Sequence, residues 1–443
     1  MRRCRDIVAY VIPMLCFVAV LVIEYKGAEK RAREYRELEH FAEFLSDLKD
    51  CFSFCKNVTE SIFRAAERVP GSLRKRLEEI CSILESDAME VVVSEEKFPG
   101  HLKYVRLFMI QCRSAVQYGS GKKGTESVFV KNMTELRRDV QNECYQRKQA
   151  MYLFAGLGVI ASAPMVFLPV IRRFGSTMME ELRAFYEGSL GDAVVAMFFC
   201  ITGCCYVLLW MLRQTSANFA KSKIGSNAVS GPVAVMLVLI VLPLLRGTSF
   251  FQKTIAVLVC VAAALVIVRL FRRYLAYLRN LGKGSEILGL QAMVLLLLDV
   301  PNLTLMELLD VLGNSAVLFR SSILRCAEEY AADDIAAIER MQAKEKEPAF
   351  RQFIGRIVGS EQIGLKAAFS EIASDRQYFR EQLRLDMEQE QKKKAANAQV
   401  VAFIPVLFLL FAYLILPFLA VSLGQMRDIF REMEQIRFLS RSL

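Results

Sequence analysis

The chain of 443 residues is 54% hydrophobic, carries a formal net charge of +10 and contains 2 histidines. Its mean hydropathy is +0.31, so the composition predicts an integral membrane protein rather than a soluble enzyme. The basic residues stand beside the apolar stretches instead of forming one patch, which fits membrane topology and argues against nucleic-acid binding.

Apolar stretches along the chain are long enough to cross, as helices, the roughly 30 Å of hydrocarbon in a bilayer. Six candidates are Ile7–Ile23, Met151–Ile171, Ala193–Leu212, Ala228–Leu245, Thr254–Val268 and Val400–Val421. No Asp, Glu, Lys, Arg or His lies inside any of them. Ionisable groups within the membrane mark ion and substrate pathways, so these spans are expected to anchor and pack rather than to transport.

Basic clusters flank the spans, and the positive-inside rule assigns them to the cytoplasmic side. They include Lys26–Arg36, Arg147 and Lys148, Arg269–Arg273, and Lys392–Lys394. Residues 24–150 and 269–398 are therefore expected in the cytoplasm, with four spans between them. Arg2, Arg3 and Arg5 favour the opposite orientation for the first span, so the side of the N-terminus stays open. That span lacks a small-residue cleavage site and is interpreted as an anchor.

Outside the spans the sequence predicts an all-α helical bundle. Apolar residues at helical spacing begin at Phe41 and continue to Phe52. Asn57 and Thr59 then provide a polar start for the next helix. Between the second and third spans, Arg172–Asp192 is expected to be a connecting turn, with a short amphipathic helix on the outer membrane surface as the alternative.

Residues 281–421 repeat the plan of residues 38–171. Lys56–Glu85 aligns with Pro301–Tyr330 at a constant offset of 245. This alignment matches Asn57 with Asn302 and Thr59 with Thr304. The order of parts, from capped helix to glycine turn to charged helix to span, carries more weight than the few identical residues.

Each copy leads from a glycine turn through a charged helix into the membrane. In the first copy, the turn Gly119–Gly124 precedes the charged stretch Lys131–Gln149. In the second copy, the turn GSEQIG is framed by Gly359 and Gly364, contains Glu361, and precedes Asp375–Asn397. The charged stretches are interpreted either as solvated helix faces or as stalks that carry force between a cytoplasmic partner and the membrane.

These patterns divide the chain into an anchor and charged linker, a first repeat, central spans, a second repeat and a tail. The corresponding ranges are 1–37, 38–171, 172–280, 281–423 and 424–443. In this division the protein is a polytopic, all-α membrane protein with two duplicated cytoplasmic helical bundles and about six transmembrane helices.

No residue pattern supplies catalytic chemistry. The 12 cysteines fall on apolar or helical stretches and are expected to be reduced thiols, and a metal site would need convergent Cys and His pairs. GSGKKGT (Gly119–Thr125) lacks the spacing of a phosphate-binding loop. We therefore expect no cofactor, no metal and no enzymatic activity, and any ATP hydrolysis would come from a partner.

The second repeat resembles the F-domain family of type II secretion and type IV pilus systems, which are inner-membrane platform proteins. LLLLDVPNLTLMELLDVLG is similar to the opening of that domain, and FRQFIGRIVGSEQIGLKAAFSEIASDRQYFREQL to its second helix pair. The final span with Pro405 and Pro417 is also similar. Two repeats separated by four spans look closer to the Tad/Flp-pilus members, and a sporulation-associated relative is an alternative.

The resemblance implies a non-enzymatic platform in the cytoplasmic membrane. Such a protein would bind a hexameric cytoplasmic assembly ATPase, pilin-like subunits and other inner-membrane components, and would form a homo-oligomer. The candidate turn and partner-facing positions are Asn57, Thr59, Asn302, Thr304, Gly359, Glu361 and Gly364. The competing hypotheses are a transporter or permease subunit that uses an external ATPase, and a membrane-anchored scaffold without a motor.

Overall fold

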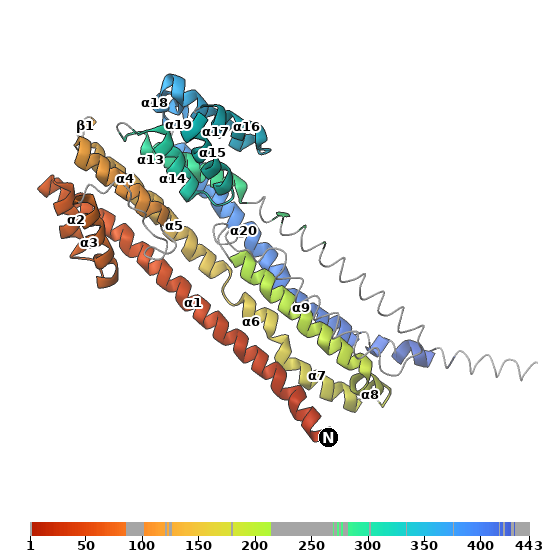
Figure 1. The fold of residues 1–443 in the computed structure, drawn as a ribbon. Coiled ribbons are helices and arrows are strands. Elements are labelled where there is room, and N and C mark those ends of the chain that lie inside the picture. The colour runs from red at the N-terminus through yellow and green to blue at the C-terminus, as the bar shows by residue number, and fades with distance from the viewer. Residues whose placement is uncertain are drawn as a thin grey trace, which may run out of the picture.

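A computed structural model describes residues 2–85, 102–119, 122–123, 126–178, 180–213, 282–300, 303–333, 335–374 and 376–415, with isolated positions at 269–277 and 417–429. These residues form a long bundle of helices with a helical body at one end (Figure 1). Apart from a two-residue antiparallel pair, β1 (Lys122–Lys123) and β2 (Glu126–Ser127), the described elements are helices. The all-α prediction is confirmed for this part of the chain.

Four described helices are long and apolar enough to cross a membrane. They contain the predicted spans Met151–Ile171 and Val400–Val421 and overlap with most of Ile7–Ile23 and Ala193–Leu212. This finding agrees with a membrane protein. The predicted spans Ala228–Leu245 and Thr254–Val268 lie outside the described residues, so the total number of spans stays a prediction.

The first helix, α1 (Arg2–Cys55), is 54 residues long, or about 80 Å at the rise of an α-helix. It joins the first span, the charged stretch and the first helix of the body without a break. The predicted boundary between the anchor and the first repeat, after position 37, therefore lies inside this helix. The body continues with α2 (Val58–Ala66), α3 (Gly71–Glu85) and α4 (Leu102–Tyr118), and α5 (Val128–Leu153) then returns along α1 toward the membrane.

The second span is not a single helix, which corrects the expectation of a continuous first stalk. Helix α5 ends at Leu153, and Gly156 adopts a φ of +73°, which favours glycine. Helix α6 (Leu157–Ser162) follows, and α7 (Pro164–Met178) begins with a proline, which lacks the N–H that would continue the hydrogen-bond ladder. The chain therefore bends twice as it enters the membrane.

The connection between the second and third spans is helical, so the predicted turn is wrong. Helix α7 extends to Met178, and α8 (Glu180–Glu187) precedes α9 (Ser189–Arg213). Leu182 and Tyr186, one helical turn apart on α8, are buried in a cluster that includes Met165 and Tyr413. Burial of these side chains explains why the segment folds back onto the bundle.

The second half begins with α13 (Lys283–Leu297) and gathers at the end of the bundle away from the N-terminus (Figure 1). Its other elements are α14 (Leu305–Ser315), α15 (Arg320–Asp333), α16 (Ile335–Lys344), α17 (Pro348–Ile363), α18 (Leu365–Ala368), α19 (Ser370–Ser374) and α20 (Arg376–Phe408). Helix α20 runs unbroken past Pro405 and widens into the π-helical segment η2 (Leu409–Ile415). The unbroken entry of the second charged helix into its span is thus confirmed.

One hydrophobic core joins the two halves of the body. It contains residues from Leu38 to Cys144 together with residues from Ile287 to Phe369. Within it Phe319 and Phe350 stack with ring centroids 4.0 Å apart. Two smaller clusters hold the membrane part together: α9 contributes buried residues to both, α20 to one and η2 to the other. The two helical units therefore pack as one body rather than as separate bundles.

Candidate functional site: the seam between the two long helices

Two of the sequence-predicted residues cap helices. Asn57 is the N-cap of α2, and its side chain accepts hydrogen bonds from the backbone N–H groups of Thr59, at 3.0 Å, and Glu60, at 3.4 Å. Thr304 is the N-cap of α14 and forms a reciprocal capping box with Glu307. Asn57 and Thr304 thus hold equivalent places, whereas Thr59, which the alignment matched with Thr304, lies in the first turn of its helix.

The glycine turn of the second repeat is shorter than predicted. Gly359 and Glu361 are part of α17, and Glu361 accepts a hydrogen bond from the hydroxyl of Tyr330. Gly364 alone leaves the helix, with φ +83° and ψ 149°, a conformation that is essentially restricted to glycine. The expected turn Gly359–Gly364 is therefore corrected to a helix end at Gly364.

These positions do not converge on one site. Asn57 and Thr59 lie on α2, Thr304 on α14, and Glu361 and Gly364 at the end of α17. Asn302 lies outside the described residues. Asn57 and Thr304 start helices, and Gly364 ends one.

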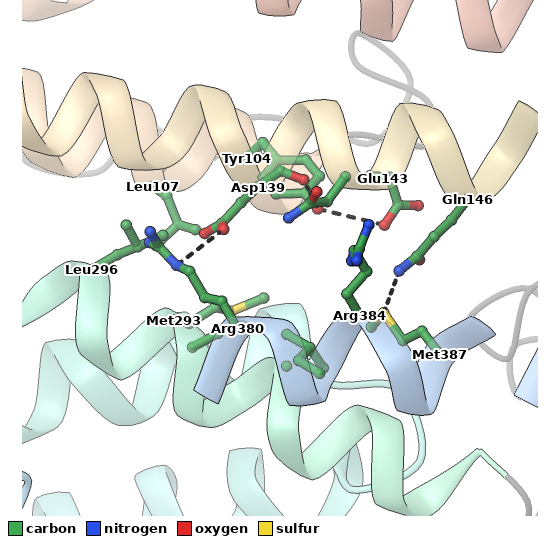
Figure 2. A pocket seen from close by; sticks show the side chains of 14 residues that line it. Tyr104, Leu107, Asp139, Glu143, Gln146, Met293, Leu296, Arg380, Arg384 and Met387 are labelled. Carbon is green, nitrogen blue, oxygen red and sulfur yellow. Dashed lines mark hydrogen bonds and ion pairs between the residues drawn. The ribbon is translucent and has the colours of Figure 1, made fainter. Parts of the chain in front are cut away.

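A charged seam joins α5 to α20 instead. Glu135, Asp139 and Glu143 follow one another at intervals of four residues on α5, and Arg380 and Arg384 are four apart on α20. Residues at this spacing share one helix face. The acidic face of α5 thereby meets the basic face of α20, and Figure 2 shows both arginines rising from α20 toward α5.

Arg380 is the central residue of the seam. Its Nη1 forms an ion pair with Glu135, and its Nε lies 3.5 Å from Oδ1 of Asp139. The three side chains are only 14–16% exposed. A buried guanidinium needs its charge compensated, so two carboxylates from the neighbouring helix fix the register of α20 against α5.

Tyr104 of α4 extends the seam into the body. Its hydroxyl donates to the backbone carbonyl of Asp139 and lies equally close, at 3.4 Å, to Oε2 of Glu143. The other oxygen of Glu143 accepts from Nε of Arg147 at 3.1 Å. Burial, followed by the charges of Glu143 and Asp139, raises the pKa of Tyr104 well above its usual value, so the phenol stays a hydrogen-bond donor.

A cleft opens along the seam between α4, α5, α13 and α20 (Figure 2). Its apolar side includes Leu107, Met293 and Leu296, and its polar side includes the charged residues above. Gln146 donates to the sulfur of Met387 across the cleft at 2.9 Å, and Gln111 donates to the carbonyl of Leu296 at 3.5 Å. These contacts join segments far apart in sequence, so the cleft forms where the two halves meet.

The contacts of this arrangement are ion pairs and hydrogen bonds between helices. Among the residues that the structure describes, no group of three or more His, Cys, Asp or Glu side chains is placed to hold a metal ion. Arg380 pairs with Glu135 and Asp139 across the seam, whereas Arg384 pairs with Glu381 on its own helix. The junction joins two helices that both lead toward the apolar spans.

Sequence reasoning missed the seam, although its signal was present. An acidic triplet and a basic pair, each at four-residue spacing on charged helices, are complementary stripes. Each stripe alone has the appearance of an ordinary solvated face, and only the packing of α5 against α20 brings the two together.

The comparisons with known proteins add no family to this picture. No protein-family model matches the chain, and no curated protein and no solved structure matches it.

Proposed function

We propose that this chain is an inner-membrane platform protein of a type II secretion or Tad-like type IV pilus assembly machine. In this role the protein is not an enzyme. It binds a cytoplasmic assembly ATPase and other inner-membrane components, works as a homo-oligomer, and moves pilin-like subunits in the membrane. The observation that carries the proposal is the seam, because Arg380 ties together two long helices that both run from one helical body into apolar spans.

The proposal includes a duplicated helical unit. Helix α4 ends at Gly119, with φ +78°, and α17 ends at Gly364, with φ +83°. These glycines are 245 residues apart, the offset at which the capped helices align. After each glycine comes a long helix, α5 or α20, that approaches the membrane. The shared order of parts supports two copies of one unit, both on the cytoplasmic side.

The two long helices differ in stiffness, which suggests how the platform works. Helix α20 continues unbroken from the body into its span, whereas α5 stops at Leu153 before the bend at Gly156. Movement of the body by the ATPase therefore reaches the membrane directly through α20. The seam makes α5 follow α20, and the bend lets α6 and α7 change angle relative to the stalk.

The alternative classes are a permease subunit driven by an external ATPase and a scaffold without a motor. Spans free of Asp, Glu, Lys, Arg and His offer a permeant substrate no charged path, and this favours the platform over the permease. Uptake of solutes into proteoliposomes that contain the purified protein would support the permease instead.

The test is complementation of a deletion strain with seam variants. Deletion is expected to abolish filament assembly or export while the ATPase of the system keeps its turnover. Arg380→Glu is expected to fail in complementation, and the reversal of both charges, Glu135→Arg with Arg380→Glu, is expected to restore part of the activity. Arg64→Glu, on an exposed ion pair of α2, is the matched control and is expected to complement.

The proposal fails if the deletion strain still makes filaments and exports cargo, and if the purified protein binds no assembly ATPase. A narrower failure is also informative. Full complementation by Arg380→Glu at normal protein levels would leave the platform role intact but would contradict coupling through the seam.

A further inference from the structure

Three membrane helices meet at a charged cluster where the apolar spans end. Glu24 directly follows the first span, and Arg213 is the last residue of α9. Nη1 of Arg213 lies 2.6 Å from Oε2 of Glu24. Nη2 donates to the carbonyl of Phe154 at 3.1 Å, where the bend after α5 interrupts the helix. The cluster therefore marks the level at which the second span begins.

The carboxylate of Glu24 is tightly enclosed. Its side chain is 13% exposed, and Tyr206 also forms a side-chain hydrogen bond with it. Gly158 of α6 packs directly against it, because a Cβ at that position would lie 2.2 Å from Oε1 of Glu24. The carboxylate of Glu24 is thus held between α1, α6 and α9.

A second guanidinium adds positive charge to the cluster. Arg31 interacts electrostatically with Arg213, Glu24 and, more weakly, Glu34, and no described carboxylate forms an ion pair with it. Its side chain folds back along α1 toward the membrane, since a Cβ on Gly27 would lie 3.3 Å from its Nη1. Of the two carboxylates that act on Arg31, Glu24 is already engaged by Arg213, and Glu34 also acts on Arg147.

Arg213 also retains an unused donor. The side chain is 9% exposed, and its Nε is buried without a hydrogen-bond partner among the described residues. A buried N–H of a charged group is costly to leave unpaired, so an acceptor is expected there. The site therefore lacks a hydrogen-bond acceptor for this N–H, and an anionic oxygen would satisfy it.

We propose that this cluster binds a phosphate group, supplied by the headgroup of an anionic phospholipid. The place fits the ligand, because the cluster lies where the apolar spans end and lipid phosphates lie at that depth of a bilayer. Arg31 contacts the phosphate oxygens from α1, and Arg213 contributes from the end of α9. The binding stabilises the junction of α1, α6 and α9. This inference is independent of the platform role.

The experiment uses the full-length protein in nanodiscs of phosphatidylcholine, with and without phosphatidylglycerol. Phosphatidylglycerol is expected to raise the midpoint of thermal unfolding, and native mass spectrometry is expected to show it retained over phosphatidylcholine. Arg31→Gln is expected to weaken retention about tenfold, the usual effect of losing a charge-assisted contact. Arg33→Gln is the matched control, because Arg33 is 68% exposed on the same helix and pairs with Glu29.

Equal retention of phosphatidylglycerol by Arg31→Gln and Arg33→Gln would overturn the proposal. If Arg31→Gln does not fold in phosphatidylcholine alone, Arg31→Lys replaces it, compared with Arg33→Lys. Lysine keeps the charge but loses the two-pronged geometry, so a several-fold weaker retention is expected at position 31 only. Inorganic phosphate separates the sources: stabilisation by phosphate alone assigns the site to a free anion, and stabilisation by the lipid alone assigns it to the headgroup.

Discussion

Tyr186 donates its hydroxyl hydrogen to the backbone carbonyl of Tyr413 across a distance of 2.7 Å. Tyr413 lies in the π-helical segment η2, whose altered hydrogen-bond pattern can leave a carbonyl available to an outside donor. Both residues are almost fully buried, and a Cβ on Gly175 would lie 2.2 Å from the ring of Tyr186. This contact fastens α8 and α7 to the last described span.

Tyr186→Phe keeps the ring and removes the donor. Because the carbonyl of Tyr413 then remains buried without this partner, we expect the free energy of unfolding to fall by about 1–3 kcal/mol. Tyr152→Phe is the control, since Tyr152 is 73% exposed, and it is expected to change stability little. Thermal unfolding of the two variants in detergent measures the difference, and equal midpoints would contradict the role of the contact.

The Glu24–Arg213 pair predicts that removal of either partner lowers the free energy of unfolding substantially. Either Glu24→Ala or Arg213→Ala leaves a buried charge uncompensated, which typically costs about 3–5 kcal/mol. The double variant is expected to be less destabilised than the sum of the two single variants. Glu29→Ala is the control, because the pair of Glu29 with Arg33 is exposed and its loss is expected to cost less than about 1 kcal/mol. Additive effects at Glu24 and Arg213 would show that the pair is not coupled.

The seam predicts coupling between α5 and α20. Arg380→Ala leaves the carboxylates of Glu135 and Asp139 close together and poorly exposed to solvent. We therefore expect the free energy of unfolding to fall by about 2 kcal/mol or more. A double-mutant cycle with Glu135→Ala measures the interaction by chemical unfolding. Arg64→Ala, on the exposed pair with Glu60, provides the comparison and is expected to lose less than about 1 kcal/mol. A coupling energy near zero between positions 135 and 380 would contradict the seam.

Glu286 predicts a pH dependence of stability. Its carboxylate accepts hydrogen bonds from the backbone N–H groups of Val317, at 2.7 Å, and Leu318, at 2.9 Å, just ahead of α15. Burial nevertheless raises the pKa of Glu286 above its ordinary value of 4.5, and the N–H donors oppose this shift only in part. A carboxyl whose pKa is raised by folding contributes its full stability below the unfolded pKa.

That contribution is lost as the pH rises through the raised pKa of the folded state. We therefore expect the unfolding midpoint of the wild type, relative to Glu286→Gln, to fall as the pH increases from about 4 toward neutrality. Thermal unfolding of both proteins across this range gives the difference at each pH. A difference that is constant, or that grows with pH, would contradict the direction of the shift.

Two glycines of the second repeat predict opposite effects of a Gly→Ala substitution on protein stability. Gly364→Ala places a Cβ on a backbone with φ +83° and ψ 149°, at a cost of about 1–3 kcal/mol. Gly359 is helical, and a Cβ there meets nothing within 4 Å. Gly359→Ala is therefore expected to stabilise by roughly 0.5–1 kcal/mol through better helix propensity. Equal destabilisation at both positions would restore the longer turn that the sequence predicted.

Local sequence patterns were sufficient to predict many helices and apolar spans of this protein. Apolar runs located the four described spans, because a helix must bury its backbone polar groups in lipid over a fixed length. Period-3.6 patterning predicted the helical body, and the polar side chain of Asn57 predicted a helix start that the structure confirms. Each of these features depends on residues within a few turns of one another.

The tertiary structure decided the contacts between distant segments. Arg380 meets Glu135 and Arg213 meets Glu24 only because of the way the long helices pack, and no local spacing encodes those partners. The same packing placed Tyr186 against Tyr413 and folded α8 back where a turn had been expected. A charged side chain looks the same in sequence whether it faces water or a partner helix. Its burial, and with it the energy of its interactions, is fixed only when the helices come together.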